Sequence, residues 1–251
     1  MKRSWLPFIT VISFGLLWEG CVAIFNIEKW ILPAPSTIFH ELYNGWETVS
    51  VHILPTVRLS ITGLIIGSTI GLLVATILHL VPFLKQMFYP LLILSQNVPI
   101  IVLAPLLVIW FGFGMLPKII VITLVCFFPI TIAALDGFKQ TNRDLLQYMR
   151  MSGATKMQIF WKLERIHALP SIFSGLKISA TYSVMGAVIS EWLGANKGLG
   201  LYMTLSSSSF RTDRVFVAIF IVMALSFIFF SIIVFIEKLI VKWKPTGREP
   251  K

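Results

Sequence analysis

Charged residues are scarce in this chain. Only 13% of its 251 residues are Asp, Glu, Lys or Arg, whereas an average soluble domain carries about 25%. Hydrophobic residues make up 57%, and the mean hydropathy is +0.86. No segment is polar enough to form a soluble domain, and several apolar runs are long. The composition therefore predicts an all-α integral membrane protein that crosses the bilayer several times.

Motifs for nucleotide hydrolysis and metal catalysis are also missing. The sequence has no G-x-x-x-x-G-K-[ST] phosphate loop and no H-E-x-x-H pair, and the glycines of "GANKGLG" have the wrong spacing. Its two cysteines, Cys21 and Cys126, lie in separate apolar runs, so they predict neither a disulfide framework nor a metal pair. We expect no catalytic residue, no metal and no cofactor in this chain.

Acidic residues are fewer than basic ones, 11 against 21, which gives a net charge of +10. A basic balance can indicate nucleic-acid binding, but no basic face with interleaved exposed aromatics occurs. Basic residues also collect on the cytoplasmic side of membrane-spanning helices. The excess of positive charge therefore indicates a membrane protein and no nucleic-acid partner.

Six apolar stretches approach the length of about 20 residues that a helix needs to cross a bilayer. We expect one transmembrane domain over 1–251 with spans at 5–27, 57–80, 89–111, 117–136, 171–193 and 215–240. The first stretch follows Lys2-Arg3 like a signal peptide but has no small-x-small cleavage site, so we assign it as a span. The third contains Pro99 and Pro105, which favours a broken helix.

The Lys and Arg distribution predicts the orientation. With the N-terminus inside, the inner segments 1–4, 81–88, 137–170 and the tail from Lys238 hold fourteen basic residues, including Lys2, Arg3, Lys244, Arg248 and Lys251 at the chain ends. The outer segments hold six: Lys29, Arg58, Lys118, Lys197, Arg211 and Arg214. This imbalance predicts a multi-pass membrane protein with both termini in the cytoplasm.

The first outer segment contains "LPAPST", which predicts extended backbone before each proline. Ser36 or Thr37 can then cap a short helix. Four apolar or aromatic residues would share one face of it: Phe39, Leu42, Tyr43 and Trp46.

A basic island, "MRMSGATKMQIFWKLERIHALP", lies between the fourth and fifth apolar stretches. Asn142 or Thr141 can cap a first helix, and Gly153 suits the left-handed position that ends it. Thr155 can cap a second short helix, and Pro170 would open the fifth span. The pattern predicts a helix-turn-helix within the cytoplasmic loop 137–170, and we call its residues 141–165 the basic hairpin.

Two functions fit the basic hairpin on pattern alone. Its apolar side chains repeat at helical spacing, through Leu145, Leu146 and Met149 in the first helix and Met157, Phe160 and Trp161 in the second. An amphipathic basic hairpin can lie on the inner leaflet, attracted by anionic lipid. Alternatively, it can insert its apolar face into a groove on a soluble partner.

The stretch "LLQYMRMSGATKMQIFWKLERIHALPSIFSGLKIS" resembles the cytoplasmic "EAA" loop of bacterial ABC importer permeases. Gly153, Ala154, Leu163 and Pro170 match that pattern. The stretches "ILPAPSTIF", "NVPIIVLAPLLVIWFGFGMLPKIIV", "FFPI" and "SEWLGANKGLG" are similar to the branch that imports nitrate, sulfonates, taurine and thiamine-precursor pyrimidines. Together these matches cover most of the chain.

The resemblance implies that the hairpin is an ATPase-coupling loop between the fourth and fifth of six transmembrane helices. It carries the coupling role onto Gln147, Met149, Gly153, Ala154, Met157, Phe160 and Trp161. Two departures stand out. Gln147, Tyr148 and Met149 occupy the Glu-Ala-Ala positions, and Ile166 replaces a first proline. The usual coupling contacts are therefore altered here.

The resemblance also implies the partners. They are two ABC ATPase subunits that bind ATP and magnesium, a second permease copy that forms a homodimer, and an extracytoplasmic solute-binding protein. The substrate would be a small organic or anionic solute, selected largely by the binding protein. The six outer basic residues suit an anionic substrate, and they suit docking to an acidic protein equally well.

Polar residues inside the membrane mark candidate positions on a translocation path. They are Gln96 and Asn97 before Pro99, Ser183 on the fifth span, and Glu191 near its outer end. Glu191 also fits an interfacial position, and Ser183 fits close helix packing. We interpret Glu19 in "LWE" as a helix-packing residue, with a substrate contact as the alternative.

A self-sufficient secondary transporter or channel is the alternative function. It would need intramembrane charges for ion coupling or for a pore ring. Glu19 and Glu191 are the clear candidates in the sequence, and no inverted repeat is visible.

Overall fold

The computed structural model describes residues 5–242, and these are helical apart from short connections. Lys2, Arg3, Lys244, Arg248 and Lys251, which contribute to the predicted orientation, lie outside this range. The elements are α1 (Leu6–Ile24), α2 (Pro35–Asn44), α3 (Trp46–Leu80), α4 (Pro82–Ser95), α5 (Ile100–Phe111), α6 (Met115–Lys139), α7 (Arg143–Met151), α8 (Lys156–Ile159), the π-helical turn η1 (Phe160–Glu164), α9 (Arg165–Glu191), α10 (Leu199–Ser208) and α11 (Thr212–Ile240).

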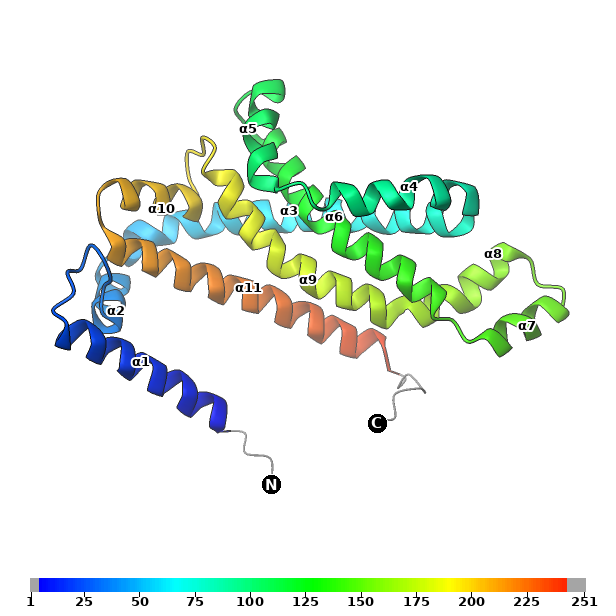
Figure 1. The fold of residues 1–251 in the computed structure, drawn as a ribbon, viewed down its shortest axis with the longest axis horizontal. Coiled ribbons are helices and arrows are strands. Elements are labelled where there is room, and N and C mark those ends of the chain that lie inside the picture. The colour runs from blue at the N-terminus through cyan, green and yellow to red at the C-terminus, as the bar shows by residue number, and fades with distance from the viewer. Residues whose placement is uncertain (1–4, 243–251) are drawn as a thin grey trace.

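The long helices α3, α6, α9 and α11 run along one elongated bundle (Figure 1). At one end α7 and α8 project as a hairpin, and at the other end α2 and α10 cover the bundle. The N-terminus of α3, the C-terminus of α9 and the N-terminus of α11 all lie toward the α10 end. The hairpin and the α2–α10 cover therefore lie at opposite ends of the long helices.

Glycines allow α3, α6 and α9 to pack with their backbones close together. A Cβ atom on Gly63 of α3 would come within 2.3 Å of Ile122 Cγ2 on α6. A Cβ atom on Gly67 would lie 2.8 Å from the carbonyl oxygen of Thr123. On α9, a Cβ atom on Gly175 would lie 2.9 Å from the carbonyl oxygen of Pro129. Small residues at these crossings thus set the separation of the three helices.

Hydroxyl groups bond the same three helices to one another. Ser179 Oγ on α9 donates to the carbonyl oxygen of Cys126 on α6 at 2.8 Å. Thr131 Oγ1 on α6 lies 2.8 Å from the carbonyl oxygen of Phe127 and 3.2 Å from that of Gly71 on α3. Each of these buried polar groups has a partner, which a membrane interior requires.

Four helices are long and apolar enough to cross a membrane: Trp46–Leu80, Met115–Lys139, Lys156–Glu191 and Thr212–Ile240. The pair Pro82–Ser95 and Ile100–Phe111 gives a fifth span if it is counted as one. The first expected span corresponds to α1, whose apolar part, Phe8–Ile24, is shorter. The all-helical class is confirmed with four or five candidate spans, and six spans stay a prediction.

The predicted break in the third span is present. Helices α4 and α5 are bent by 99° at their junction, where Pro99 adopts an extended conformation with ψ of 116°. Residues before a proline avoid the helical region, which ends α4 at Ser95. In Figure 1, α4 runs back alongside α3, whereas α5 turns away from α3 and packs against the first part of α6.

Two helices begin earlier than predicted. Helix α3 begins at Trp46 instead of residue 57, and α4 begins at Pro82 instead of residue 89. Pro82 suits the first position of α4, because a backbone N–H at that position would have no partner within the helix. The 35 residues of α3 rise about 52 Å, which exceeds a hydrocarbon core of about 30 Å. An untilted α3 would therefore extend beyond the apolar layer.

The predicted cap of α2 is wrong. Pro35 occupies the first helical position after Ala34, and no side chain of the capping residue bonds the first turn. Instead, Glu19 of α1 accepts hydrogen bonds from the Ser36 amide at 3.0 Å and from Ser36 Oγ at 2.7 Å. The predicted apolar face is also mostly exposed, and Ile38 is the buried residue. Glu19 thus connects α1 to α2.

We expect the Gly67→Ala substitution to destabilise the chain by about 1–3 kcal/mol, because its Cβ would press on the α6 backbone. Thermal unfolding in detergent measures the loss. Gly20→Ala on α1 is the control, since no atom lies within 4 Å of that Cβ position. Equal unfolding temperatures for the two variants would contradict glycine-mediated packing.

Candidate functional site

The basic hairpin forms through the local signals that the sequence predicts. Asn142 Oδ1 accepts from the amides of Asp144 at 2.8 Å and Leu145 at 3.3 Å, which caps α7. Gly153 follows α7 with φ of 75°. Its amide donates to Arg150, and the Ala154 amide donates to Met149, each at 3.0 Å. This is the paired pattern of a Schellman C-cap.

The second arm of the hairpin begins with a capping box. The Gln158 amide donates to Thr155 Oγ1 at 3.3 Å, and the Thr155 amide donates to Gln158 Oε1 at 2.8 Å. The chain then continues through α8 and η1 into α9 without a break. The prediction that Pro170 opens the fifth span is wrong. Pro170 lies inside α9, where Ala168 and Ser171 pack against Gly137 of α6.

Aromatic rings and one His–Glu hydrogen bond hold the base of the hairpin. His79 Nε2 on α3 lies 2.8 Å from Glu164 Oε2, with both side chains about 15% exposed. The His79 ring lies 4.9 Å from the ring of Phe138 and 6.0 Å from that of Phe160. Phe160 is only 3% exposed. Among the predicted coupling residues, Phe160 therefore anchors the hairpin instead of lying on its surface.

Several large apolar side chains on the hairpin are exposed. The exposed fraction reaches 88% for Met151 and 71% for Tyr148, and Leu145, Met157 and Trp161 are also exposed. Of the other predicted coupling residues, Gln147 and Gly153 are exposed, whereas Met149 and Ala154 are half-buried. The Arg165 guanidinium lies 4.5 Å from the centre of the Trp161 ring. The hairpin thus presents apolar side chains within a basic surface.

A buried carboxylate organises the opposite end of α9. Glu191 is 2% exposed, and it accepts hydrogen bonds from Thr56 Oγ1 at 2.8 Å and the Gly200 amide at 2.8 Å. The Leu199 amide donates to Thr56 Oγ1 at 2.9 Å, and the Gly198 amide donates to His52 Nδ1 at 3.1 Å. We call this group of contacts the Glu191 lock.

The Glu191 lock satisfies the free amides at the start of α10. A carboxylate at a helix N-terminus is also favoured by the helix dipole. Glycine is required at two positions of the lock. A Cβ atom on Gly198 would lie 2.2 Å from Glu191 Cδ, and one on Gly200 would lie 2.3 Å from the Val188 carbonyl oxygen. The lock fixes the 192–198 loop against α3 and α9.

The predicted path residues lie in two separate places. Gln96 and Asn97 are exposed at the break between α4 and α5, and Asn97 donates to the Ile93 carbonyl oxygen at 2.8 Å. Ser183 is fully buried and donates to Ala180 within its own helix. Glu191 is held in the lock. Within this chain, Ser183 and Glu191 therefore face packed protein.

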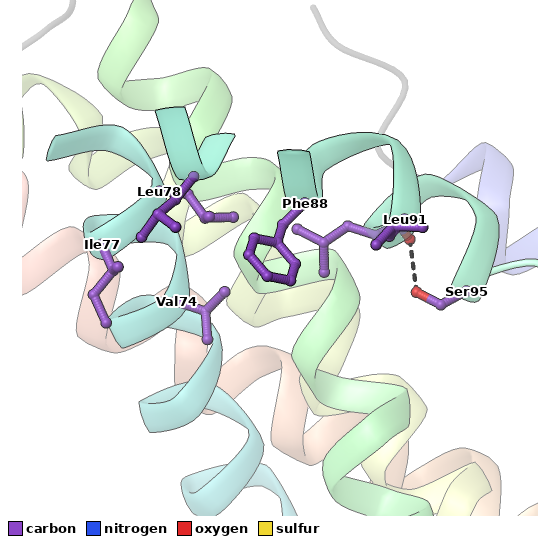
Figure 2. A pocket seen from close by; sticks show the side chains of 8 residues that line it. Val74, Ile77, Leu78, Phe88, Leu91 and Ser95 are labelled. Carbon is purple, nitrogen blue, oxygen red and sulfur yellow. Dashed lines mark hydrogen bonds between the residues drawn. The ribbon is translucent and has the colours of Figure 1, made fainter. Parts of the chain in front are cut away.

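An apolar groove of about 350 Å³ lies between the end of α3 and α4. Figure 2 shows the side chains that line it: Val74, Ile77, Leu78, Leu84, Phe88, Leu91, Leu92 and Ser95. Ser95, its one polar side chain, donates to its own helix at Leu92. Across residues 5–242, no cluster of three or more His, Cys, Asp or Glu side chains could hold a metal.

The sequence did not point to four residues that the structure places at these two ends: His52, Thr56, His79 and Glu164. Their partners are far apart in the chain, and Thr56 and Glu191 are 135 positions apart. A signal was available only for Glu191, because a buried carboxylate requires donors. Nothing in the sequence named those donors.

Comparison with known proteins identifies the fold's family. A family described as binding-protein-dependent transport system inner membrane component matches residues 67–242. The chain belongs to this family. The matched range includes the basic hairpin, Glu191 and the loop that carries Gly198 and Gly200. His52 and Thr56 precede the matched range. The resemblance to ABC permeases is thereby confirmed.

Similar proteins extend over nearly all of this inner membrane component. The formylaminopyrimidine transport permease protein ThiX of Halalkalibacterium halodurans is 34% identical over 97% of this chain and 99% of its own length. A putative aliphatic sulfonates transport permease protein of Bacillus subtilis is 27% identical over 97% and 88%. The taurine transport system permease protein TauC of Escherichia coli is 26% identical over 84% and 80%.

We expect Thr56→Val to weaken the Glu191 lock by about 1–3 kcal/mol, because it leaves the Leu199 amide and one carboxylate oxygen without their partner. Hydrogen exchange at residues 198–201 would rise. Thr62→Val is the matched control, since Thr62 Oγ1 bonds only to the Arg58 carbonyl oxygen of its own helix. Unchanged exchange in the Thr56 variant would contradict the lock.

Proposed function

We propose that the chain is the transmembrane permease subunit of an ATP-binding-cassette importer in the bacterial inner membrane. It forms the path for a small organic or anionic solute, and a separate ATPase drives its alternating access. Both termini and the basic hairpin lie in the cytoplasm, and six helices cross the bilayer. The membership of the inner membrane component family, together with the exposed apolar hairpin, supports this function.

The basic hairpin is the ATPase contact. Exposed Tyr148, Met151, Met157 and Trp161 present a large apolar surface on a rigidly capped turn. Such a surface suits insertion into a groove on a soluble partner. Gln147, Met149, Gly153 and Ala154 shape the turn, whereas Phe160 fixes it to α3 and α6 through His79 and Phe138. The ATPase binds ATP and magnesium, and this chain binds neither.

The complete transporter contains two permease copies, two ATPase subunits and an extracytoplasmic solute-binding protein. A closed pair with twofold symmetry is the simplest assembly for one hairpin per chain. The path runs between the two copies, and Gln96 and Asn97 at the exposed break contribute to it. Glu191 and Ser183 shape the path indirectly, by fixing the helices that form it.

Co-purification tests the function. The chain is expressed with its ATPase and binding protein and isolated through a tag on the chain itself. ATPase subunits should co-purify. Uptake into proteoliposomes should require ATP in the vesicle lumen, which corresponds to the cytoplasm. Full transport by the chain alone, with no ATPase attached, would establish the secondary transporter or channel instead.

We expect Trp161→Ala to weaken ATPase association at least tenfold, because a half-exposed tryptophan is a typical hot spot of an interface. The thermal stability of the chain should change little. Trp192→Ala, which removes another partly exposed tryptophan at the far end of α9, should leave association unchanged. Equal association of both variants would remove Trp161 from the interface.

We expect Phe160→Ala to act differently, by destabilising the chain by about 3–5 kcal/mol through the loss of a buried ring. Thermal unfolding measures this loss, and association should fall only as far as the hairpin loses its order. A stable Phe160 variant with strongly reduced association would place Phe160 at the ATPase surface, against its burial.

A further inference from the structure

A second groove lies on α3, beside the Glu191 lock. It has a volume of about 470 Å³ and is lined by Ser50, Val51, Leu54, Pro55, Arg58 and Lys197. Clefts that hold small ligands have volumes of about 300–1,000 Å³. Val51, Leu54 and Pro55 make an apolar wall, and two basic side chains complete the lining. The groove combines a surface for a short apolar body with two positive charges.

The two basic residues of this groove differ from Lys118, Arg211 and Arg214 at the same end of the bundle. Arg211 and Arg214 pair with Glu41 at 2.9 and 2.8 Å, and Lys118 donates to the Gly194 carbonyl oxygen at 3.3 Å. Within residues 5–242, neither Arg58 nor Lys197 has a carboxylate within 4.0 Å. Their charges are free to meet an anion.

The Glu191 lock brings Lys197 to this place. The Gly198 amide, directly after Lys197, bonds His52, and the Leu199 amide bonds Thr56. Both partners belong to the same part of α3 that carries Arg58. The loop therefore holds Lys197 beside α3. The backbone contacts of the loop fix the position of Lys197 relative to Arg58.

With Leu80 at the inner boundary of the hydrocarbon layer, Arg58 would lie near the outer boundary. Arg58 lies about 33 Å along α3 from Leu80, which corresponds to one hydrocarbon thickness of about 30 Å. With the basic hairpin in the cytoplasm, the groove opens on the outer side. A solute released by a binding protein would meet it first.

We propose that this groove is a binding site for the acidic group of a small organic anion, a carboxylate or a sulfonate, at the outer mouth of the permease. The planar guanidinium of Arg58 forms paired hydrogen bonds with two oxygens of such a group. Lys197 adds a second positive charge, and the apolar wall contacts the rest of the solute. This inference rests on the proposed function and adds the class of solute and the site that receives it.

The test measures anion binding to the full chain in phosphatidylcholine nanodiscs. Trifluoromethanesulfonate is the probe, detected by ¹⁹F saturation-transfer NMR, and neutral trifluoroethanol is the control ligand. We expect binding of the anion to wild type, and about tenfold weaker binding to Arg58→Gln and to Lys197→Gln. Arg58→Lys, which keeps the charge but not the paired bonds, should bind with intermediate strength.

Lys29→Gln is the matched control variant, because Lys29 is an outer lysine outside the groove. It should bind the anion as wild type does. Equal binding by all variants would overturn the proposal, as would an equal loss in Lys29→Gln, which would indicate general surface charge. Loss of the wild-type signal in nanodiscs that contain phosphatidylglycerol would assign the groove to a lipid headgroup and would also overturn it.

The ATPase co-purification of Arg58→Gln separates this proposal from the proposed function. Association should be unchanged, because the groove and the hairpin lie at opposite ends of the bundle (Figure 1). A chain that binds its ATPase but shows no site for the anion would overturn only the groove. A chain that binds the anion in nanodiscs but does not co-purify with its ATPase would overturn the importer and leave the groove intact.

Discussion

Close packing of the backbones of α3, α6 and α9 is the constraint on which the rest of the structure depends. Glycines at the crossings set the distance, and a methyl group at Gly63, Gly67 or Gly175 would meet atoms of the neighbouring helix at less than 3 Å. Interiors packed this tightly move between discrete arrangements and do not deform gradually. The three helices therefore form one body that can carry a displacement from end to end.

The two ends of that body are built from the same helices. At one end His79 of α3, Phe138 of α6 and Phe160 of η1 hold the base of the basic hairpin. At the other end Thr56 of α3 and Glu191 of α9 hold the start of α10. Because α9 continues directly from the hairpin through η1, a push on the hairpin acts along the helix that ends at Glu191. This continuity would link the proposed ATPase contact to the loop that follows α9.

Local signals made the hairpin predictable. Asn142, Gly153 and Thr155 act on backbone groups within a few residues, so their spacing alone indicates the two helix ends. Pro99 likewise predicts the break between α4 and α5. Polar residues at a helix end or a proline in an apolar run carry this information without any knowledge of the tertiary structure.

Contacts between distant segments were not predictable in the same way. The sequence does not indicate that Thr56 meets Glu191, that His79 meets Glu164, or that Phe160 is buried while its neighbour Trp161 is exposed. The sequence likewise did not indicate that Glu19 of α1 caps α2, because the contact joins two separate helices. Pro170 shows the converse error, because tertiary packing against α6 keeps a helix continuous where local propensity favours an end.

The continuity of the helix from Lys156 to Glu191 is the central claim, and a distance measurement tests it most directly. Spin labels at Lys156→Cys and Trp192→Cys, with both native cysteines replaced and the labelled chain diluted in unlabelled chain to remove distances between copies, report the length of the helix by double electron–electron resonance. A continuous helix predicts one narrow distribution near about 54 Å, unchanged when the ATPase binds ATP. A broad distribution, or a second shorter distance, would place a hinge at η1 and contradict direct transmission.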